Sequence, residues 1–167
     1  MAAWVQRWAI VDASEPGAPV FLNGQLTLPE EGGDLFCSGH AWTSDGELLV
    51  AGGTTRYVGG SFGGRLVYLW DPDGGPTGAW RRQPDLAVDR YYPTVMLIDT
   101  GELLIAGGRP RSEHEHNDYE VFTPRRGAHG NARFAPTRRF PGPQFPADDF
   151  SLYPRIHQLE TGEQLGF

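Results

Sequence analysis

Residues 36–53 have the sequence FCSGHAWTSDGELLVAGG, and residues 90–108 have the similar sequence RYYPTVMLIDTGELLIAGG. A third copy, LYPRIHQLETGEQL, occupies residues 152–165. Each copy has an opening segment, a turn that contains a glycine, and a second segment. The turn glycines at positions 46, 101 and 162 are 55 and 61 residues apart. The chain is therefore built from a repeated unit, and this unit decides the fold.

The repeat predicts an all-β fold. Its period is close to the roughly 50 residues of a kelch-type β-propeller blade. The chain contains 23 Gly, 14 Pro and 20 aromatic residues among its 167, which suits short strands joined by tight turns and predicts no long helix. We expect about two complete four-stranded blades and the start of a third. Because a closed propeller typically has four to eight blades, the chain is interpreted as an incomplete propeller.

The segments fall into two regions. Residues 1–33 form an N-terminal segment, interpreted as part of a preceding blade, and residues 34–167 form a partial propeller. Short strands are expected in the N-terminal segment on both sides of the breaker at 15–17. In the partial propeller, strands are expected up to residue 42, at 47–51, at 66–70, from residue 80, at 92–97, at 102–106, at 119–122, at 133–134 and within 152–165. Residues 123–149, rich in Pro, Gly and Arg, are expected to be mostly a long connecting loop.

Charge and hydropathy exclude several classes of partner. The net charge is −7, and all 14 basic residues are Arg. This balance argues against nucleic acid or an anionic membrane as a principal partner. No apolar run approaches the ~20 residues of a transmembrane helix, and residues 1–8 show no recognisable signal peptide. The cellular compartment is left open, since a single cysteine excludes only an intrachain disulfide.

The openings of the first two repeats carry a more specific pattern. The first opening contains Cys37, and the second places Tyr92 after an arginine and another tyrosine. Together with the double glycines that close both repeats, these openings resemble the copper radical oxidases, namely the galactose oxidase and glyoxal oxidase group and its bacterial relatives. The resemblance covers roughly residues 34–165 by the repeat period. Double glycines alone are common to kelch propellers, so the cysteine and tyrosine pair gives the resemblance its specificity.

The resemblance implies a cofactor made from the chain itself. It implies that the sulfur of Cys37 becomes joined to a ring carbon of Tyr92, and that the modified phenol binds copper and carries a radical. Such a centre oxidises primary alcohols, sugars or aldehydes and reduces O2 to H2O2, without an organic cofactor. Because neighbouring residues on a strand point to opposite faces, Tyr92 rather than Tyr91 is expected to meet Cys37. Members of this family are often secreted.

Three differences from the family pattern lead us to expect no turnover by this chain alone. The family uses a second tyrosine and two histidines as further copper ligands, and these would come from later repeats. Galactose oxidase also has a tryptophan that shields the radical just beyond the second double glycine, where this chain has Arg109 and Pro110. In galactose oxidase a C-terminal domain supplies a further ligand, and we expect no counterpart of that domain within residues 1–167.

A second interpretation stays open beside the first. Cys37 and Tyr92 can be packing residues of a non-catalytic kelch-like propeller that binds proteins or carbohydrates, since cysteine is often buried and aromatics favour strands.

His114 and His116 lie in a polar run, which we interpret as a solvated loop because no third ligand stands at diagnostic spacing. Unpaired strand edges of an incomplete propeller are expected to favour self-association.

Overall fold

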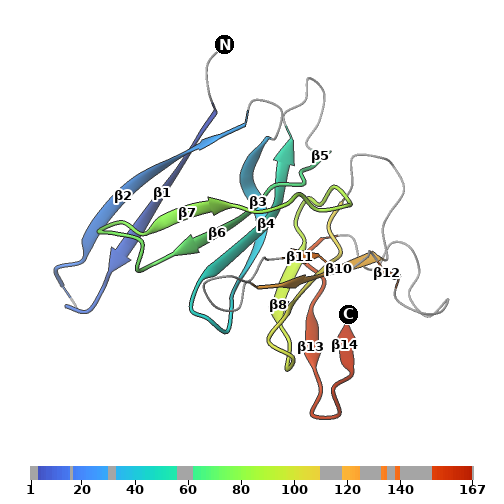
Figure 1. Ribbon diagram of the computed structural model, residues 1–167. Coiled ribbons are helices and arrows are strands. Elements are labelled where there is room, and N and C mark those ends of the chain that lie inside the picture. Colours follow the sequence, from blue (N-terminus) through green and yellow to red (C-terminus); the bar gives the residue numbers. More distant parts are fainter. Residues whose placement is uncertain are drawn as a thin grey trace.

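The computed structural model describes residues 4–15, 17–29, 33–55, 62–109, 118–124, 133–134, 138–139 and 152–166 (Figure 1). These residues form fourteen β-strands and contain no helix, which confirms the expected all-β class for the described part of the chain. All strand pairs are antiparallel, and none of the sheets formed by the described strands closes into a barrel.

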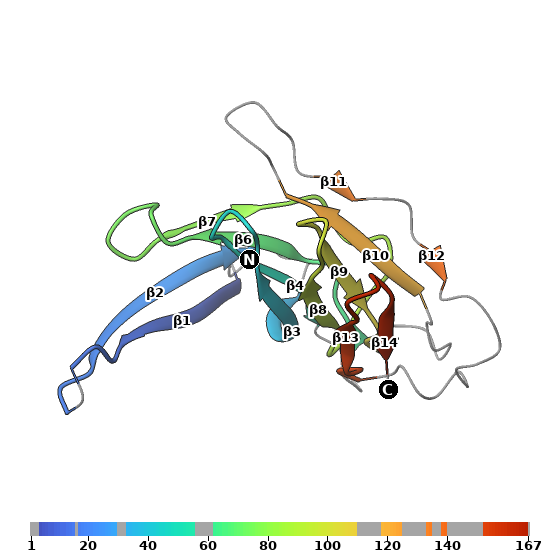
Figure 2. The ribbon, with the colours of Figure 1, turned by 90° about the horizontal axis from the view of Figure 1, so that it is seen from below.

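The chain begins with a long hairpin. Strands β1 (Trp4–Asp12) and β2 (Val20–Leu28) pair along their whole length and extend away from the rest of the molecule (Figures 1 and 2). Each strand is longer than the short segments expected from the sequence. The base of the hairpin packs on the next sheet, because the buried Leu28 joins a core cluster with Leu35, Val50 and Tyr68. The indole ring of Trp8 also lies edge-on to the rings of Trp70 and Trp80 in the next sheet.

The first large sheet contains the first full repeat. Its strand order is β3 (Asp34–Trp42), β4 (Leu48–Thr55), β6 (Val67–Asp71) and β7 (Ala79–Arg82), and the short β5 (Phe62–Gly63) pairs with β4. The expected turn at residues 44–46 joins β3 to β4. The N–H of Gly46, which has a φ of 84°, donates to the carbonyl of Thr43. Glycine adopts this left-handed conformation without the penalty of a Cβ atom.

The second large sheet repeats this order. Strands β8 (Thr94–Leu97), β9 (Leu103–Ala106), β10 (Asp118–Thr123) and β11 (Arg133–Phe134) lie side by side, and β12 (Arg138–Arg139) pairs with the other end of β10. The strand expected at 133–134 is thus present. Strand β12 lies within the stretch that was expected to be loop. The sheet is followed by a second hairpin, β13 (Ile156–Gln158) and β14 (Gln164–Gly166), from the third repeat.

The core lies between successive sheets. Nine buried residues of the two large sheets and their connections form one apolar cluster: Leu49, Ala51, Val67, Leu69, Leu86, Val95, Leu103, Ile105 and Phe122. The opposite face of the second large sheet meets the last hairpin, because Leu104 and Ala106 cluster with Ile156. The four β units therefore stack in chain order, each packed on the next (Figure 2).

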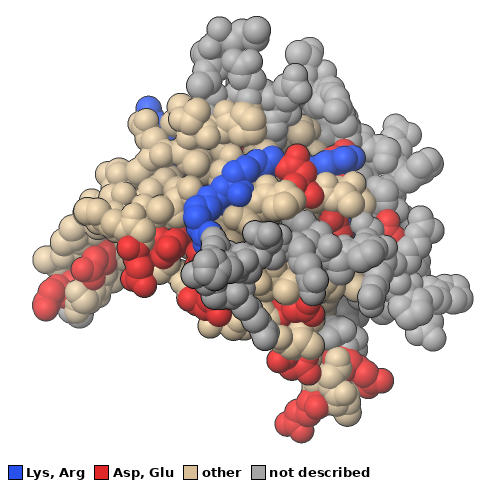
Figure 3. Space-filling view, in the orientation of Figure 1, with Lys and Arg blue, Asp and Glu red and all other residues tan. Residues whose placement is uncertain are grey.

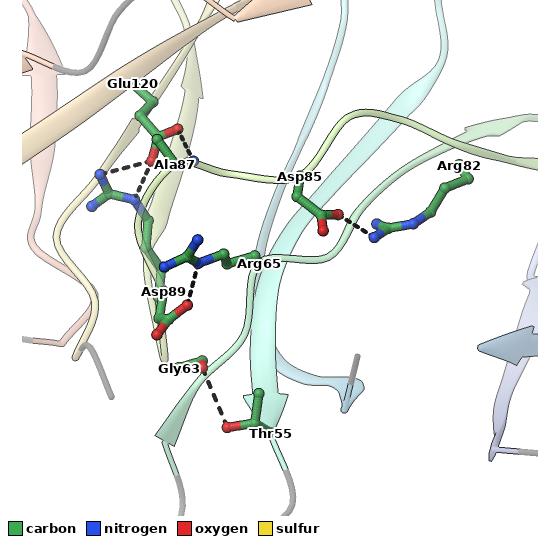
Figure 4. Close-up of polar contacts among 9 residues, drawn as sticks. Thr55, Gly63, Arg65, Arg82, Asp85, Ala87, Asp89 and Glu120 are labelled. Atoms are coloured by element: carbon green, nitrogen blue, oxygen red, sulfur yellow. Dashed lines mark hydrogen bonds and ion pairs between the residues drawn. The ribbon is translucent and has the colours of Figure 1, made fainter. Parts of the chain in front are cut away.

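The surface carries both charges. Figure 3 shows basic side chains in a stripe across one face, with acidic side chains gathered toward the ends of the hairpins. Some of the described arginines pair with neighbouring carboxylates, as Arg65 does with Asp89 and Arg82 with Asp85 (Figure 4). A helix with the length and apolar character of a membrane span is not found in the part of the chain that the structure describes.

Candidate functional site

Three residues of the repeats have an unusual backbone conformation. Among the described residues, only Cys37, Tyr92 and Tyr153 have a positive φ without being glycine, with values of 63°, 60° and 45°. A left-handed conformation costs an L-residue with a Cβ atom roughly 1–2 kcal/mol. Such strain persists only where the surroundings fix it, and it gathers at functional sites. All three residues occupy the same place in their repeats, nine positions before the turn glycines at 46, 101 and 162.

Backbone hydrogen bonds join the three residues directly. The N–H of Tyr92 donates to the carbonyl of Cys37 at 2.8 Å, and the N–H of Tyr153 donates to the carbonyl of Tyr92 at 2.7 Å. Cys37 lies in β3 at a shift of register between Asp34 and Ser38, and both tyrosines lie just ahead of the strands β8 and β13. The bonds thus run between three successive β units. They fix the Cys37 and Tyr92 backbones beside each other.

The side chains of this region form an aromatic stack. The ring centroids of Tyr91 and Tyr92 are 4.2 Å apart, and those of Tyr92 and Tyr153 are 4.7 Å apart. The expectation that Tyr91 and Tyr92 point to opposite faces is therefore wrong. Both residues precede the first residue of β8, and the left-handed backbone of Tyr92 removes the strand alternation on which that expectation depended.

Cys37, whose backbone is hydrogen-bonded to that of Tyr92, is a free thiol. It is 7% exposed, whereas Tyr153 is 48% exposed. The hydrogen bond between the Tyr92 side chain and Cys37 is the largest cause that raises the pKa of the Tyr92 phenol, followed by the hydrogen bond with Tyr91. Burial raises the pKa of Tyr153, and the proximity of Cys37 and Tyr91 adds to this effect. One thiol and three phenols therefore share a single local environment.

A buried ion pair supports the segment that carries Tyr92. Arg90 is fully buried, and its Nε and Nη2 atoms each donate to Oε1 of Glu120 at 3.2 Å. Nη1 of Arg90 donates to the carbonyls of Gly107 and Asp118 at 2.7 and 3.1 Å. The other carboxylate oxygen of Glu120 accepts a hydrogen bond from the N–H of Ala87 at 2.8 Å (Figure 4). These bonds tie residue 90 to the second sheet.

Glycines let the two large sheets approach each other at the site. A Cβ atom built on Gly39 would lie 2.5 Å from the carbonyl oxygen of Pro93, and one built on Gly52 would lie 2.6 Å from the carbonyl oxygen of Arg90. The backbone of β3 and β4 therefore touches the segment around Tyr92 at distances that only glycine allows. The repeated double glycines thus have a packing role beside the site.

The described residues offer an incomplete set of metal ligands. No group of three or more His, Cys, Asp or Glu side chains is placed to hold a metal ion within the described part of the chain. His40 and His157 lie on exposed positions of β3 and β13. His114 and His116 lie outside the described residues. Phenol oxygens and a thiol are the donors that the stack provides.

Sequence reasoning singled out Cys37 and Tyr92 but missed two other members of the site. Tyr153 takes the same position in the third repeat, so the spacing to the turn glycine was a signal that could have found it. Arg90 was seen as part of a motif, and nothing in its residue type indicated full burial. The structure brings Tyr91, Tyr92 and Tyr153 together beside Cys37.

Comparison with known proteins gives only distant structural likenesses. No protein-family model matches the chain, and no curated protein matches it. Among solved structures, a fungal alcohol oxidase of the AA5 family, in complex with copper, is similar to this chain at 22% sequence identity and a TM-score of 0.44. The similarity covers 55% of this chain and 17% of the oxidase chain. The matched part of the oxidase is therefore a small fraction of that protein.

Proposed function

We propose that Cys37 and Tyr92 are the precursor of a thioether-linked redox centre in a protein of the copper radical oxidase type. The substrates of such a protein are primary alcohols, sugars or aldehydes, with O2 as oxidant and H2O2 as product. One observation carries the proposal: a buried thiol and a phenol stand on adjacent backbones, joined by the hydrogen bond from the N–H of Tyr92 to the carbonyl of Cys37 at 2.8 Å, and both backbones have a strained left-handed conformation. Backbone strain at two neighbouring residues is typical of a functional site rather than of ordinary core packing.

The proposed architecture agrees with this site. We infer that the two large sheets are successive blades of a kelch-type propeller, and that the last hairpin begins a third blade. Supporting this, each large sheet has the four-strand order of its repeat, and the sheets stack face against face in chain order. In such an arrangement the first strand of each blade lies nearest the centre. Cys37, Tyr92 and Tyr153 would then gather at that centre, ahead of or within those first strands.

The bond that forms in this proposal is a carbon–sulfur bond. The thiol of Cys37 loses its S–H hydrogen, and a ring carbon of Tyr92 next to the hydroxyl loses its C–H hydrogen. The two electrons and two protons released reduce one O2 molecule to H2O2. The joined side chains are lighter than the separate ones by two hydrogen atoms, and the Tyr92 hydroxyl stays available as a ligand.

Copper binding needs more than the described residues provide. Cu(II) favours a tetragonal set of nitrogen and oxygen ligands, and imidazole is a preferred donor. The aromatic stack supplies phenol oxygens and a sulfur, and the described residues contain no cluster of three or more His, Cys, Asp or Glu side chains. These residues alone therefore do not fit the metal. In this proposal Tyr92 contributes one ligand, and the other ligands lie outside the described residues.

A peptide map after oxidation tests the proposal. The full chain is incubated with copper(II) sulfate in air, or with a chelator in air, and is then alkylated, digested and analysed by mass spectrometry. We expect a joined peptide that contains Cys37 and Tyr92, two hydrogen atoms lighter than its separate parts. Tyr92→Phe should abolish this product, and Tyr91→Phe, the matched control, should keep it.

Two outcomes would overturn the proposal. The first is a Cys37 that stays fully alkylatable after incubation with copper(II) and O2, as expected of a packing residue in a non-catalytic binding protein. The second is a joined peptide that maps to Tyr91 in the wild-type chain. Circular dichroism of each variant shows whether it has kept the β-sheet structure.

A further inference from the structure

Tyr153 occupies the third of three equivalent positions. Cys37 and Tyr92 hold the first two, and all three share the left-handed conformation that a non-glycine residue adopts only when its surroundings impose it. Tyr153 is bonded through its N–H to the carbonyl of Tyr92 at 2.7 Å. This bond places the Tyr153 backbone directly beside that of Tyr92.

The ring of Tyr153 packs against the ring of Tyr92. Its ring centroid is 4.7 Å from that of Tyr92, with an angle of 39° between the planes. Its hydroxyl donates to the carbonyl of Ser38, the residue after Cys37, at 3.4 Å. One side chain thus contacts the tyrosine of the pair and the strand that carries the cysteine. Tyr91 lies 4.2 Å from Tyr92 by ring centroids, so Tyr92 has an aromatic neighbour in Tyr91 as well.

We propose that Tyr153 is a positioning residue, which holds the Tyr92 phenol beside the Cys37 thiol and covers both from solvent. This rests on the proposed function insofar as the pair is a redox centre. Tyr153 touches the ring that would be modified, yet it supplies none of the atoms that form the thioether. The sequence had indicated that a shielding aromatic was absent after the second double glycine. In this chain the covering ring comes instead from the third repeat.

The left-handed backbone provides a clean variant for the test. Tyr153→Gly removes the ring but keeps the N–H that bonds to Tyr92, and glycine adopts a φ of 45° without strain. Tyr153→Phe keeps the ring and removes only the hydroxyl. Leu152→Ala is the matched control, since Leu152 is adjacent and equally exposed at 48%.

The first measurement uses metal-free protein and does not depend on oxidase chemistry. The rate of alkylation of Cys37 by iodoacetamide is followed for each variant. We expect Tyr153→Gly to raise this rate roughly 2- to 13-fold, the factor that corresponds to the about 0.5–1.5 kcal/mol of an aromatic pair. Tyr153→Phe and Leu152→Ala should react at the wild-type rate. An unchanged rate in Tyr153→Gly overturns the proposal.

The second measurement separates this inference from the proposed function. After incubation with copper(II) sulfate in air, Tyr153→Gly should give less of the Cys37–Tyr92 product, or divert Cys37 to Tyr91, while Tyr153→Phe behaves as wild type. A wild-type yield and selectivity in Tyr153→Gly overturns the positioning role. If the wild-type chain forms no thioether at all, the redox centre fails, and the alkylation rates still decide whether Tyr153 holds the pair.

Discussion

The buried pair of Arg90 and Glu120 gives a prediction whose size follows from the structure. Glu120 is 1% exposed and accepts two hydrogen bonds from Arg90 and one from the N–H of Ala87. In Glu120→Leu, the guanidinium stays buried without its counter-charge. Removing one partner of a buried pair typically costs about 3–5 kcal/mol, because the remaining charge is desolvated and uncompensated. This is a large part of the roughly 5–15 kcal/mol by which folded domains are stable.

The assay is urea unfolding followed by tryptophan fluorescence, with the alkylation of Cys37 measured in parallel. Because Arg90 lies two residues before Tyr92 and its carbonyl accepts the N–H of Gly53 at 3.0 Å, loss of the pair should also speed the alkylation of Cys37. The double variant Arg90→Met/Glu120→Leu should lose less stability than the sum of the single variants, by about 1–3 kcal/mol.

An exposed ion pair serves as the control. Arg82 and Asp85 are 34% and 53% exposed, and solvent-exposed pairs contribute about 0–1 kcal/mol. Asp85→Asn should therefore change the free energy of unfolding by less than about 1 kcal/mol. The reasoning is refuted if Glu120→Leu costs no more than Asp85→Asn, or if the two single changes at Arg90 and Glu120 add without coupling.

Three further changes test other parts of the molecule. Gly39→Ala should destabilise the fold by about 1–3 kcal/mol in urea unfolding, because the added methyl group meets the Pro93 carbonyl; no loss would contradict the close approach of the sheets. Tyr92 should be titrated by tyrosinate absorbance, and its raised pKa should fall toward the ordinary 10.0 in Cys37→Ala. Because the folded state favours the protonated phenol, Tyr92 contributes to the free energy of unfolding below pH 10.0, and this contribution is lost as the pH rises through the pKa of the folded state. If the pKa of Tyr92 is the same in Cys37→Ala as in the wild type, the hydrogen bond with Cys37 is not its cause. Phe21→Lys should reduce any self-association seen by sedimentation velocity, because Phe21 is 59% exposed on the first hairpin.

The strands were the most predictable part of the structure. The apolar runs before the double glycines became β4 and β9, and the segment expected at 119–122 lies inside β10 (Asp118–Thr123). Period and turn glycines suffice for such elements, because each strand buries side chains in a regular pattern. Strand β12 was missed. It contains only two residues and exists by pairing with Asp118 and Tyr119, so it leaves no periodic signal.

The site was predicted only as a pair of residue types. Their spacing in the repeats indicated that Cys37 and Tyr92 are equivalent, and the structure places their backbones in direct contact. The left-handed conformations were not predictable, because they depend on contacts between different β units. For the same reason, strand alternation gave the wrong relation between Tyr91 and Tyr92. The burial of Arg90 required knowledge of Glu120, which lies thirty positions later in the chain.

Two hydrogen bonds, from the N–H of Tyr92 to the carbonyl of Cys37 and from the N–H of Tyr153 to the carbonyl of Tyr92, join the three residues through backbone atoms alone. Because side chains take no part in them, the links can survive replacement of any of the three residues by another non-proline residue that tolerates the left-handed conformation, such as glycine or asparagine. The backbone that holds the site together is thus independent of the side chains that would react there. Each position can be varied without breaking the backbone links, which makes the trio a natural starting point for engineering a different set of reactive groups at one point of a β scaffold.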